Sequence, residues 1–258
     1  MFDLIDECGQ DLKSCGYTIK KLKEYDISLA SLKIESKEKS KKLGLDIGEY
    51  YIFNSPLIYQ NDFENTSYLI TLLSQQIKKL LKSFGLNKSS KFLIVGLGNP
   101  DIDSDKLGKV VFDNIEIDAL NKKNNIFKFC PNIFFSTGID TFEMVKLFTS
   151  HLKVDCVIIV DSLTTSSLNR LGKSFQITTS GMTPGSGVNR FGKRINEESI
   201  KAKCLSIGVP FMIFSSSLTS NQENDMILSP KDIKENVEIA GFIIAKSIME
   251  SLSWIITY

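Results

Sequence analysis

Two stretches of the chain repeat apolar residues at intervals of three and four, which is the spacing of one helix face. Residues 65–85 form the first stretch, and Gly85 is a natural C-terminal stop. Residues 231–252 form the second, through Ile233, Val237, Ile244 and Ile248. The pattern predicts two amphipathic helices, and the apolar face of the first is expected to cover a sheet. Its apolar positions are Leu69, Leu72, Leu73, Ile77, Leu80, Leu81 and Phe84.

Short continuous apolar runs alternate with helical patterns between these two helices. Residues 92–96 read as a buried strand, followed by a loop and a helix through Leu107, Val110 and Val111 that Ser104 is expected to cap. Residues 132–135 are expected to form a second strand, 137–141 a turn and 142–152 a helix.

A third unit of the same kind begins with the apolar run at residues 156–160. Asp161 is expected to end this strand, and residues 162–170 to form a short turn or helix. Residues 206–210 and 211–214 supply one or two more strands. Alternating strands and helices predict a three-layer α/β fold with a mainly parallel sheet and helices on both faces.

The N-terminal 42 residues differ from the rest of the chain. They are polar and lysine-rich, and their periodicity is weak until Tyr50 and Tyr51 begin an apolar run. We interpret residues 1–42 as an exposed arm or propeptide and residues 43–258 as a single α/β domain.

Composition narrows the class of protein. Hydrophobic residues make up 42% of the 258 positions, enough to bury a substantial core, and the net charge of +1 provides no basic field for direct nucleic-acid binding. The apolar runs are too short to span a bilayer. Five cysteines without a CxxC pair indicate reduced thiols, so we expect a soluble cytoplasmic protein. No bound cofactor is expected, because the G-x-G at Gly96 and Gly98 lacks the third glycine of a dinucleotide fingerprint, and no residue is assigned as a metal ligand.

Two aspartates follow apolar runs and are the candidate functional pair. Asp105 lies in the loop after residues 92–96, and Asp161 follows residues 156–160. In open α/β sheets, ligands and catalytic groups gather at the carboxyl edge of the strands, where both side chains are expected. Taken alone, Asp105 could have only a structural role, stabilising the start of a helix through capping or the helix dipole. Asp161 could likewise be a structural polar residue at the end of a strand. His151 is the only histidine, so no serine or cysteine triad competes.

Several motifs, in order and at similar spacing, resemble one protein family. They are VGLGN at residues 95–99, SDKLG at 104–108, TGIDT at 137–141, VDSLTTSSLNR at 160–170, QITTSGMTPGSGV at 176–188 and DMILSPKDI at 225–233. The chain resembles the germination protease of spore-forming bacteria, an endopeptidase that degrades small acid-soluble spore proteins. The resemblance implies that Asp105 and Asp161 are catalytic and that cleavage occurs next to glutamate. It also implies a homotetramer in the spore core or forespore, with DNA-coating proteins as substrates.

The chemistry of two carboxylates fits this implied activity. One ionised group can activate water while one protonated group donates to the substrate, and close juxtaposition separates the two pKa values. Two alternatives stay open: a metal-dependent maturation-type peptidase of the same fold, and a degenerate homologue that binds spore proteins without cutting them.

The same motifs supply candidate residues around the catalytic pair. We expect the substrate site or its rim to include Asn99, Thr137, Gly138, Arg170, Gly185, Ser186 and Gly187. Gly185 and Gly187 would let backbone N–H groups approach a substrate carbonyl, although Pro and Gly also mark ordinary turns.

The family resemblance further implies a zymogen that removes its own propeptide after an acidic residue preceding Leu-Ala. The corresponding bond here joins Ser28 and Leu29, so a serine stands at the expected acidic position. The chain also lacks a long segment that the family has before its C-terminal helix. It is therefore expected to be a compact, divergent member.

Overall fold

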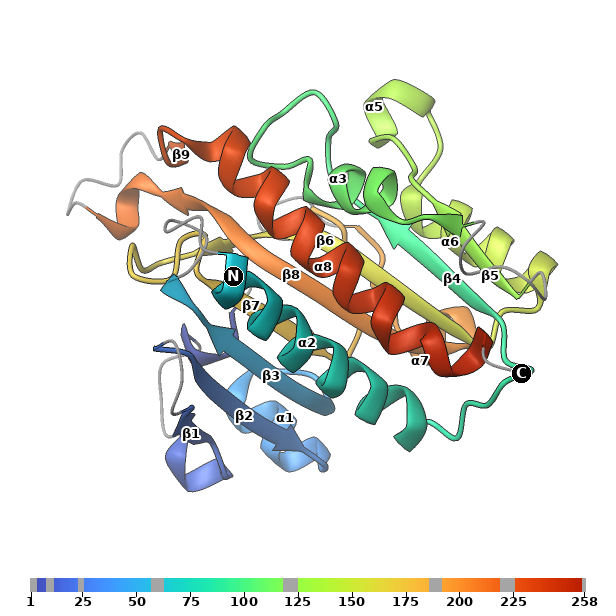
Figure 1. Ribbon diagram of the computed structural model, residues 1–258, viewed down its shortest axis with the longest axis horizontal. Coiled ribbons are helices and arrows are strands. Elements are labelled where there is room, and N and C mark those ends of the chain that lie inside the picture. The colour runs from blue at the N-terminus through green and yellow to red at the C-terminus, as the bar shows by residue number, and fades with distance from the viewer. Residues whose placement is uncertain are drawn as a thin grey trace.

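The computed structural model describes residues 4–7, 12–22, 26–56, 63–117, 125–185, 192–218 and 226–256. A mixed sheet runs through these residues in the strand order β1-β2-β3-β7-β8-β6-β4-β5, with β9 paired to β8 (Figure 1). The strands are β1 Thr18–Lys21, β2 Ser28–Ile34, β3 Gly48–Asn54, β4 Phe92–Gly96, β5 Ile126–Phe129, β6 Cys156–Thr165, β7 Ser174–Thr178, β8 Lys203–Phe214 and β9 Ile227–Leu228.

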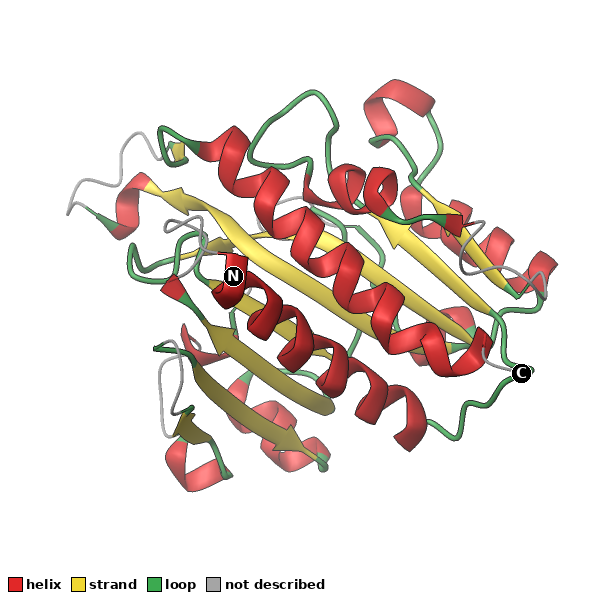
Figure 2. Cartoon of the chain, in the orientation of Figure 1, coloured by secondary structure: helices red, strands yellow, loops and turns green. Residues whose placement is uncertain are grey.

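Helices cover both faces of this sheet (Figure 2). The α-helices are α1 Lys37–Leu43, α2 Phe63–Ser83, α3 Leu107–Asn114, α5 Phe134–Thr137, α6 Thr141–Leu152, α7 Glu197–Ile200 and α8 Ile233–Ile256, and the 3₁₀ turns are η1 Ile5–Glu7, η2 Lys13–Cys15 and η5 Ser215–Ser217. Strands β5, β4, β6 and β8 are parallel, whereas β7, β3, β2 and β1 are antiparallel to their neighbours. The predicted three-layer α/β fold is confirmed.

The two faces of the sheet carry different cores. Helices α2, α3 and α8 pack on one face and bury the main apolar cluster, which includes Ile158 and Val160 of β6 and Phe175 of β7. The opposite face carries two smaller clusters. Helices α6 and α7 cover one of them, with Val157 and Ile159, while η1, η2 and α1 help to form the other, with Tyr50 and Ile52 of β3. The odd-numbered residues of β6 therefore face away from the main cluster.

The long periodic helices were predicted well. Residues 65–85 correspond to α2, which ends at Ser83 and is followed by a turn in which Gly85 has φ +76°, and residues 231–252 correspond to α8. Both helices pack side by side on the main cluster (Figure 1). Local periodicity was sufficient here because each helix buries one continuous apolar stripe.

Short apolar runs gave wrong predictions. Residues 132–135 are not a strand: the strand of that unit is β5, and Phe134 begins the short helix α5. Runs of this length fit a helix turn as well as a strand. Ser104 does not cap α3, because the N-cap residue is Lys106 and it forms no side-chain cap among the described contacts. Residues 206–210 and 211–214 form one strand, β8.

Residues 162–165 continue β6 instead of forming a turn or helix. They pair with β8 as far as Thr165, opposite Ile213. The pairing shifts between Leu163 and Thr164, where β8 contributes one extra residue, Phe211, and β6 contributes none. Strand β6 therefore keeps its regular alternation through Thr165.

The expectation of an exposed N-terminal arm is wrong for residues 28–34. Strand β2 pairs with β1 on one side and with β3 along seven residues on the other. Ala30, Leu32 and Ile34 are buried in it. The lysine-rich end of this region forms the helix α1, which follows β2.

Three glycines hold the β4–α3 loop close to the first turn of α3. A Cβ on Gly98, whose φ is +102°, would collide with the carbonyl oxygen of Asp105 and lie 3.3 Å from its Oδ1. A Cβ on Gly96 or Gly108 would strike backbone atoms across the same contact. The glycines of the VGLGN and SDKLG motifs thus permit the approach that determines where Asp105 lies.

If β2 is part of the core, Leu32→Ala should lower the free energy of unfolding by about 2–4 kcal/mol, because Leu32 is 2% exposed. Ile19→Ala, on β1 and 62% exposed, is the control and should cost less than about 1 kcal/mol. Urea unfolding of both variants measures this. Equal small losses would show that β2 does not belong to the folded core.

Gly98→Ala should destabilise the protein by at least about 3 kcal/mol, because the new methyl group adds a backbone collision to an unfavourable φ. Gly85→Ala has a similar φ of +76° but open space around it, and it should cost only about 1–2 kcal/mol. Chemical denaturation of the two variants separates collision from conformational strain. A Gly98 variant no less stable than the Gly85 variant would contradict the close approach.

Candidate active site

The site lies where β6 runs past the end of β4. The last β4 residue, Gly96, pairs with Val160, and the backbone N–H of Leu97 donates to the Val160 carbonyl at 2.8 Å. Asp161 is the next residue of β6. It therefore lies at the carboxyl edge of β4, although it is inside its own strand and not at the strand's end as the sequence suggested.

Asp161 is buried on the face of the sheet opposite α2, α3 and α8. It is 7% exposed, and its Oδ1 accepts a hydrogen bond from the Ser162 N–H at 2.9 Å. Across the sheet it pairs with Gly208 of β8, which in turn pairs with Gln176 of β7. Since paired residues point to the same face, the Asp161 and Gln176 side chains emerge on one face with a glycine between them.

Asp105 faces back into its own loop. Its Oδ2 accepts from the Asn99 backbone N–H at 2.8 Å, and its own N–H donates to the Ile102 carbonyl at 2.9 Å. It directly precedes Lys106, the N-cap residue of α3, so it is not itself the cap of this helix. The adjacent Lys106 is paired with Asp103 at 2.7 Å and with Glu238 at 3.6 Å.

A short chain of contacts connects the two aspartates. Leu97 is bonded to Val160, the residue before Asp161, while Gly98 and Asn99 contact Asp105 directly. The loop that carries Asp105 and the strand that carries Asp161 thus meet at one edge of the sheet. This is the edge at which the sequence predicted both carboxylates.

The other expected rim residues lie in three separate loops. Thr137 and Gly138 form an exposed turn before α6, in which Thr137 Oγ1 accepts from the Ile139 N–H at 3.2 Å and Gly138 has φ +70°. This turn and the β4–α3 loop lie at the same end of the sheet (Figure 1). The Arg170 guanidinium donates to Asn54 Oδ1 on β3 at 3.3 Å. Gly185 has φ +74°, and Ser186 and Gly187 lie outside the described residues.

The expected processing site lies inside the sheet. Ser28 pairs with both Lys21 and Asn54, and Leu29 with both Lys20 and Phe53. A protease could reach the Ser28–Leu29 bond only after β2 had separated from at least one neighbour.

Sequence reasoning missed a polar strip on the same face as Asp161. The strip consists of Asp161 and Thr165 of β6, Ser206 of β8, and Gln176 and Thr178 of β7, and it lies between the two smaller apolar clusters. Buried polar groups normally serve a specific hydrogen-bonding purpose. The available signal was the alternation of polar and apolar residues in SFQIT at residues 174–178.

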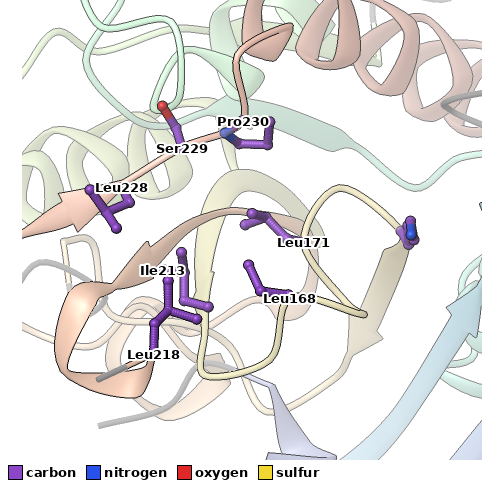
Figure 3. A pocket seen from close by; sticks show the side chains of 8 residues that line it. Leu168, Leu171, Ile213, Leu218, Leu228, Ser229 and Pro230 are labelled. Atoms are coloured by element: carbon purple, nitrogen blue, oxygen red, sulfur yellow. The ribbon is translucent and has the colours of Figure 1, made fainter. Parts of the chain in front are cut away.

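An apolar pocket opens beyond the end of this strip. It measures about 380 Å³, and Leu168, Leu171, Ile213, Leu218, Leu228 and Pro230 are among its lining residues (Figure 3). Ile213 is the pairing partner of Thr165, so the pocket begins next to the last residue of β6.

Other nucleophiles and ligand groups are poorly placed in the described part of the chain. Burial raises the pKa of Cys204 to about 12 and that of Cys156 well above its ordinary value. His151 is exposed in the last turn of α6. Across the described ranges, no group of three or more His, Cys, Asp and Glu side chains is arranged to hold a metal ion.

No helix in the described segments combines the length and the hydropathy needed to cross a bilayer.

Comparison with known proteins agrees with the motifs. The family profile described as germination protease matches residues 6–238. The chain is similar to germination proteases from Caldanaerobacter subterraneus subsp. tengcongensis (29% identity, 86% of this chain and 71% of the relative), Clostridium tetani (28%, 83% and 68%) and Bacillus licheniformis (27%, 82% and 60%). Since the profile covers most of the sequence, including both aspartates, the chain belongs to the germination protease family.

Proposed function

We propose that this protein is an endopeptidase that initiates degradation of small acid-soluble, DNA-protecting spore proteins during germination. Membership of the germination protease family supports a peptidase, and similarity to germination proteases supports a role in the spore. Part of the proposal is that the protein acts in the spore core or forespore as a homo-oligomer, by resemblance a tetramer. It would act on proteins that bind DNA and would not itself bind nucleic acid.

The proposed catalytic pair is Asp105 and Asp161. The observation that supports it most is the Leu97–Val160 hydrogen bond, because this contact brings the Asp105 loop against the strand position that precedes Asp161. Each aspartate has a backbone N–H donor on one oxygen, which orients the carboxyl group. A water between two such groups can be deprotonated by one while the other protonates the substrate.

The supporting residues have proposed roles that follow from their positions. Asn99 holds the Asp105 carboxylate through its backbone N–H. Thr137 and Gly138 form a turn at the same end of the sheet, where a substrate peptide could lie against them. Gly185 begins the loop that is proposed, with Ser186 and Gly187, to contact the substrate backbone. Arg170 ties the loop after β6 to β3.

Maturation by cleavage at Ser28–Leu29 receives no support from the geometry. Loss of residues 1–28 would remove β1 and the contribution of Ile5 and Cys15 to the apolar cluster on β2 and β3. We propose that this member keeps β1 and β2 in its active form.

Replacing either catalytic aspartate should abolish cleavage. Purified protein is incubated with a small acid-soluble spore protein, and cleavage is followed by mass spectrometry. Asp105→Asn and Asp161→Asn should each lower the rate by about 10³-fold or more, because a neutral amide can serve neither as base nor as acid. Asp101→Asn, at an exposed position of the same loop, is the matched control and should retain activity.

The same assay separates the alternatives. Activity that survives a chelator supports the two-aspartate mechanism, whereas its loss would favour the metal-dependent alternative. Undiminished cleavage by both Asn variants would show that Asp105 and Asp161 are not catalytic. Binding of the spore protein without any cleavage by the wild type would identify a degenerate homologue.

Treatment with iodoacetamide at pH 7.5 should leave the peptidase activity unchanged. Burial raises the pKa of Cys130, Cys156 and Cys204, so few of these thiols are ionised at that pH, and Cys15 is also buried. Cys8 lies outside the described residues. A cysteine peptidase treated in parallel confirms that the reagent is active. Rapid, complete inactivation would indicate that the peptidase activity depends on a cysteine thiol.

A further inference from the structure

A carboxylate of the N-terminal segment, that of Glu7, lies at the carboxyl end of β6. Both oxygens of Glu7 are engaged: Oε1 accepts from the Thr165 hydroxyl, and Oε2 accepts from the Ser166 backbone N–H at 2.8 Å. Thr165 is 1% exposed. A buried hydroxyl and a backbone amide that each donate a hydrogen bond to one carboxylate oxygen form a binding site for a carboxylate group.

Other contacts hold this N-terminal segment in place. Leu4 and Ile5 are buried, and the Ile5 N–H donates to Gln176 Oε1 at 3.0 Å in a buried contact. Ile5 also belongs to the apolar cluster on β2 and β3. The segment therefore has anchors besides the Glu7 carboxylate.

The carboxylate site is on the same face of the sheet as Asp161. Asp161, Leu163 and Thr165 alternate regularly along β6, because the bulge is on β8. At about 3.3 Å per residue, Thr165 lies roughly 13 Å from Asp161 between Cα atoms. Gln176, which binds Ile5, is two strands from Asp161, or roughly 10 Å away. A peptide extending from Asp161 toward Thr165 would therefore pass beside the N-terminal segment.

We propose that Thr165 Oγ1 and the Ser166 N–H form a carboxylate subsite that binds an acidic side chain of the substrate, and that Glu7 competes for this subsite. The inference rests on the proposed endopeptidase function. An extended peptide advances about 3.3 Å per residue. The distance between Asp161 and Thr165 therefore means that the subsite binds a substrate residue roughly two to four positions from the cut bond. The apolar pocket is lined in part by Ile213, the pairing partner of Thr165 (Figure 3).

The test measures binding separately from cleavage. A fluorescein-labelled peptide with one glutamate and its glutamine counterpart are titrated into full-length protein by fluorescence anisotropy. Glu7→Gln should bind the glutamate peptide about tenfold more tightly than wild type, because a neutral amide competes poorly for two donors, and should bind the glutamine peptide unchanged. Glu38→Gln, at an exposed position on α1, is the matched control and should behave as wild type.

Thr165 variants on the Glu7→Gln background show which group binds the peptide. Thr165→Val should lose about tenfold in affinity for the glutamate peptide, and Thr165→Ser, which keeps the hydroxyl, should restore it. Because Thr165 Oγ1 also accepts from the Ser167 N–H at 3.1 Å, urea unfolding of the valine variant checks that its loss of affinity is not a folding defect. Equal binding of both peptides to Glu7→Gln, or serine and valine variants that bind alike, would overturn the subsite.

Cleavage of the spore protein and binding of the glutamate peptide test the endopeptidase function and the subsite separately. If the spore protein is cut but Glu7→Gln shows no gain for the glutamate peptide, only the subsite is wrong. If glutamate-selective binding appears and no cleavage is seen, the subsite stands and the endopeptidase assignment fails.

Discussion

The parallel pairing of β6 with β8 is the constraint on which the candidate site depends. This pairing extends along the whole of β6, whereas β4 accompanies only its first half, from Cys156 to Val160. The second half of β6 therefore projects beyond the edge of β4 while staying hydrogen-bonded to β8. Asp161 and Thr165 are both on this projecting half, and a rigid strand fixes the distance between them.

The short reach of β4 also makes room for the loop that carries Asp105. This loop can come close to α3 only because Gly96, Gly98 and Gly108 lack side chains. Its entry is bonded to Val160, and its exit passes directly into α3, which packs on the main apolar cluster. The position of Asp105 is thus set by a strand contact at one end and by helix packing at the other. A carboxylate held in this way needs little reorganisation when a substrate arrives.

The opposite face of the sheet explains why polar residues gather near Asp161. Two separate apolar clusters cover this face, one under α6 and α7 and the other under the N-terminal elements. Neither cluster covers β7 and the projecting part of β6, so polar side chains such as Gln176 and Thr165 can be kept there with hydrogen-bond partners. Because η1 lies along the same strip, the N-terminal residues both complete a cluster and approach the candidate active site.

The sequence by itself determined the elements whose signal is local. The periodic stripes of α2 and α8, the apolar strand β4 and the motif glycines around Asp105 could all be read from neighbouring residues, and the family motifs identified the two aspartates. Only the tertiary structure decided that Ser162–Thr165 belongs to β6, because this mostly polar segment resembles a turn until residues of β8 much later in the chain pair with it. It alone decided that Ser28–Ile34 is an internal strand and that Glu7 reaches Thr165. Contacts between residues distant in sequence leave no periodic pattern in either partner, since each segment acquires its conformation from the other.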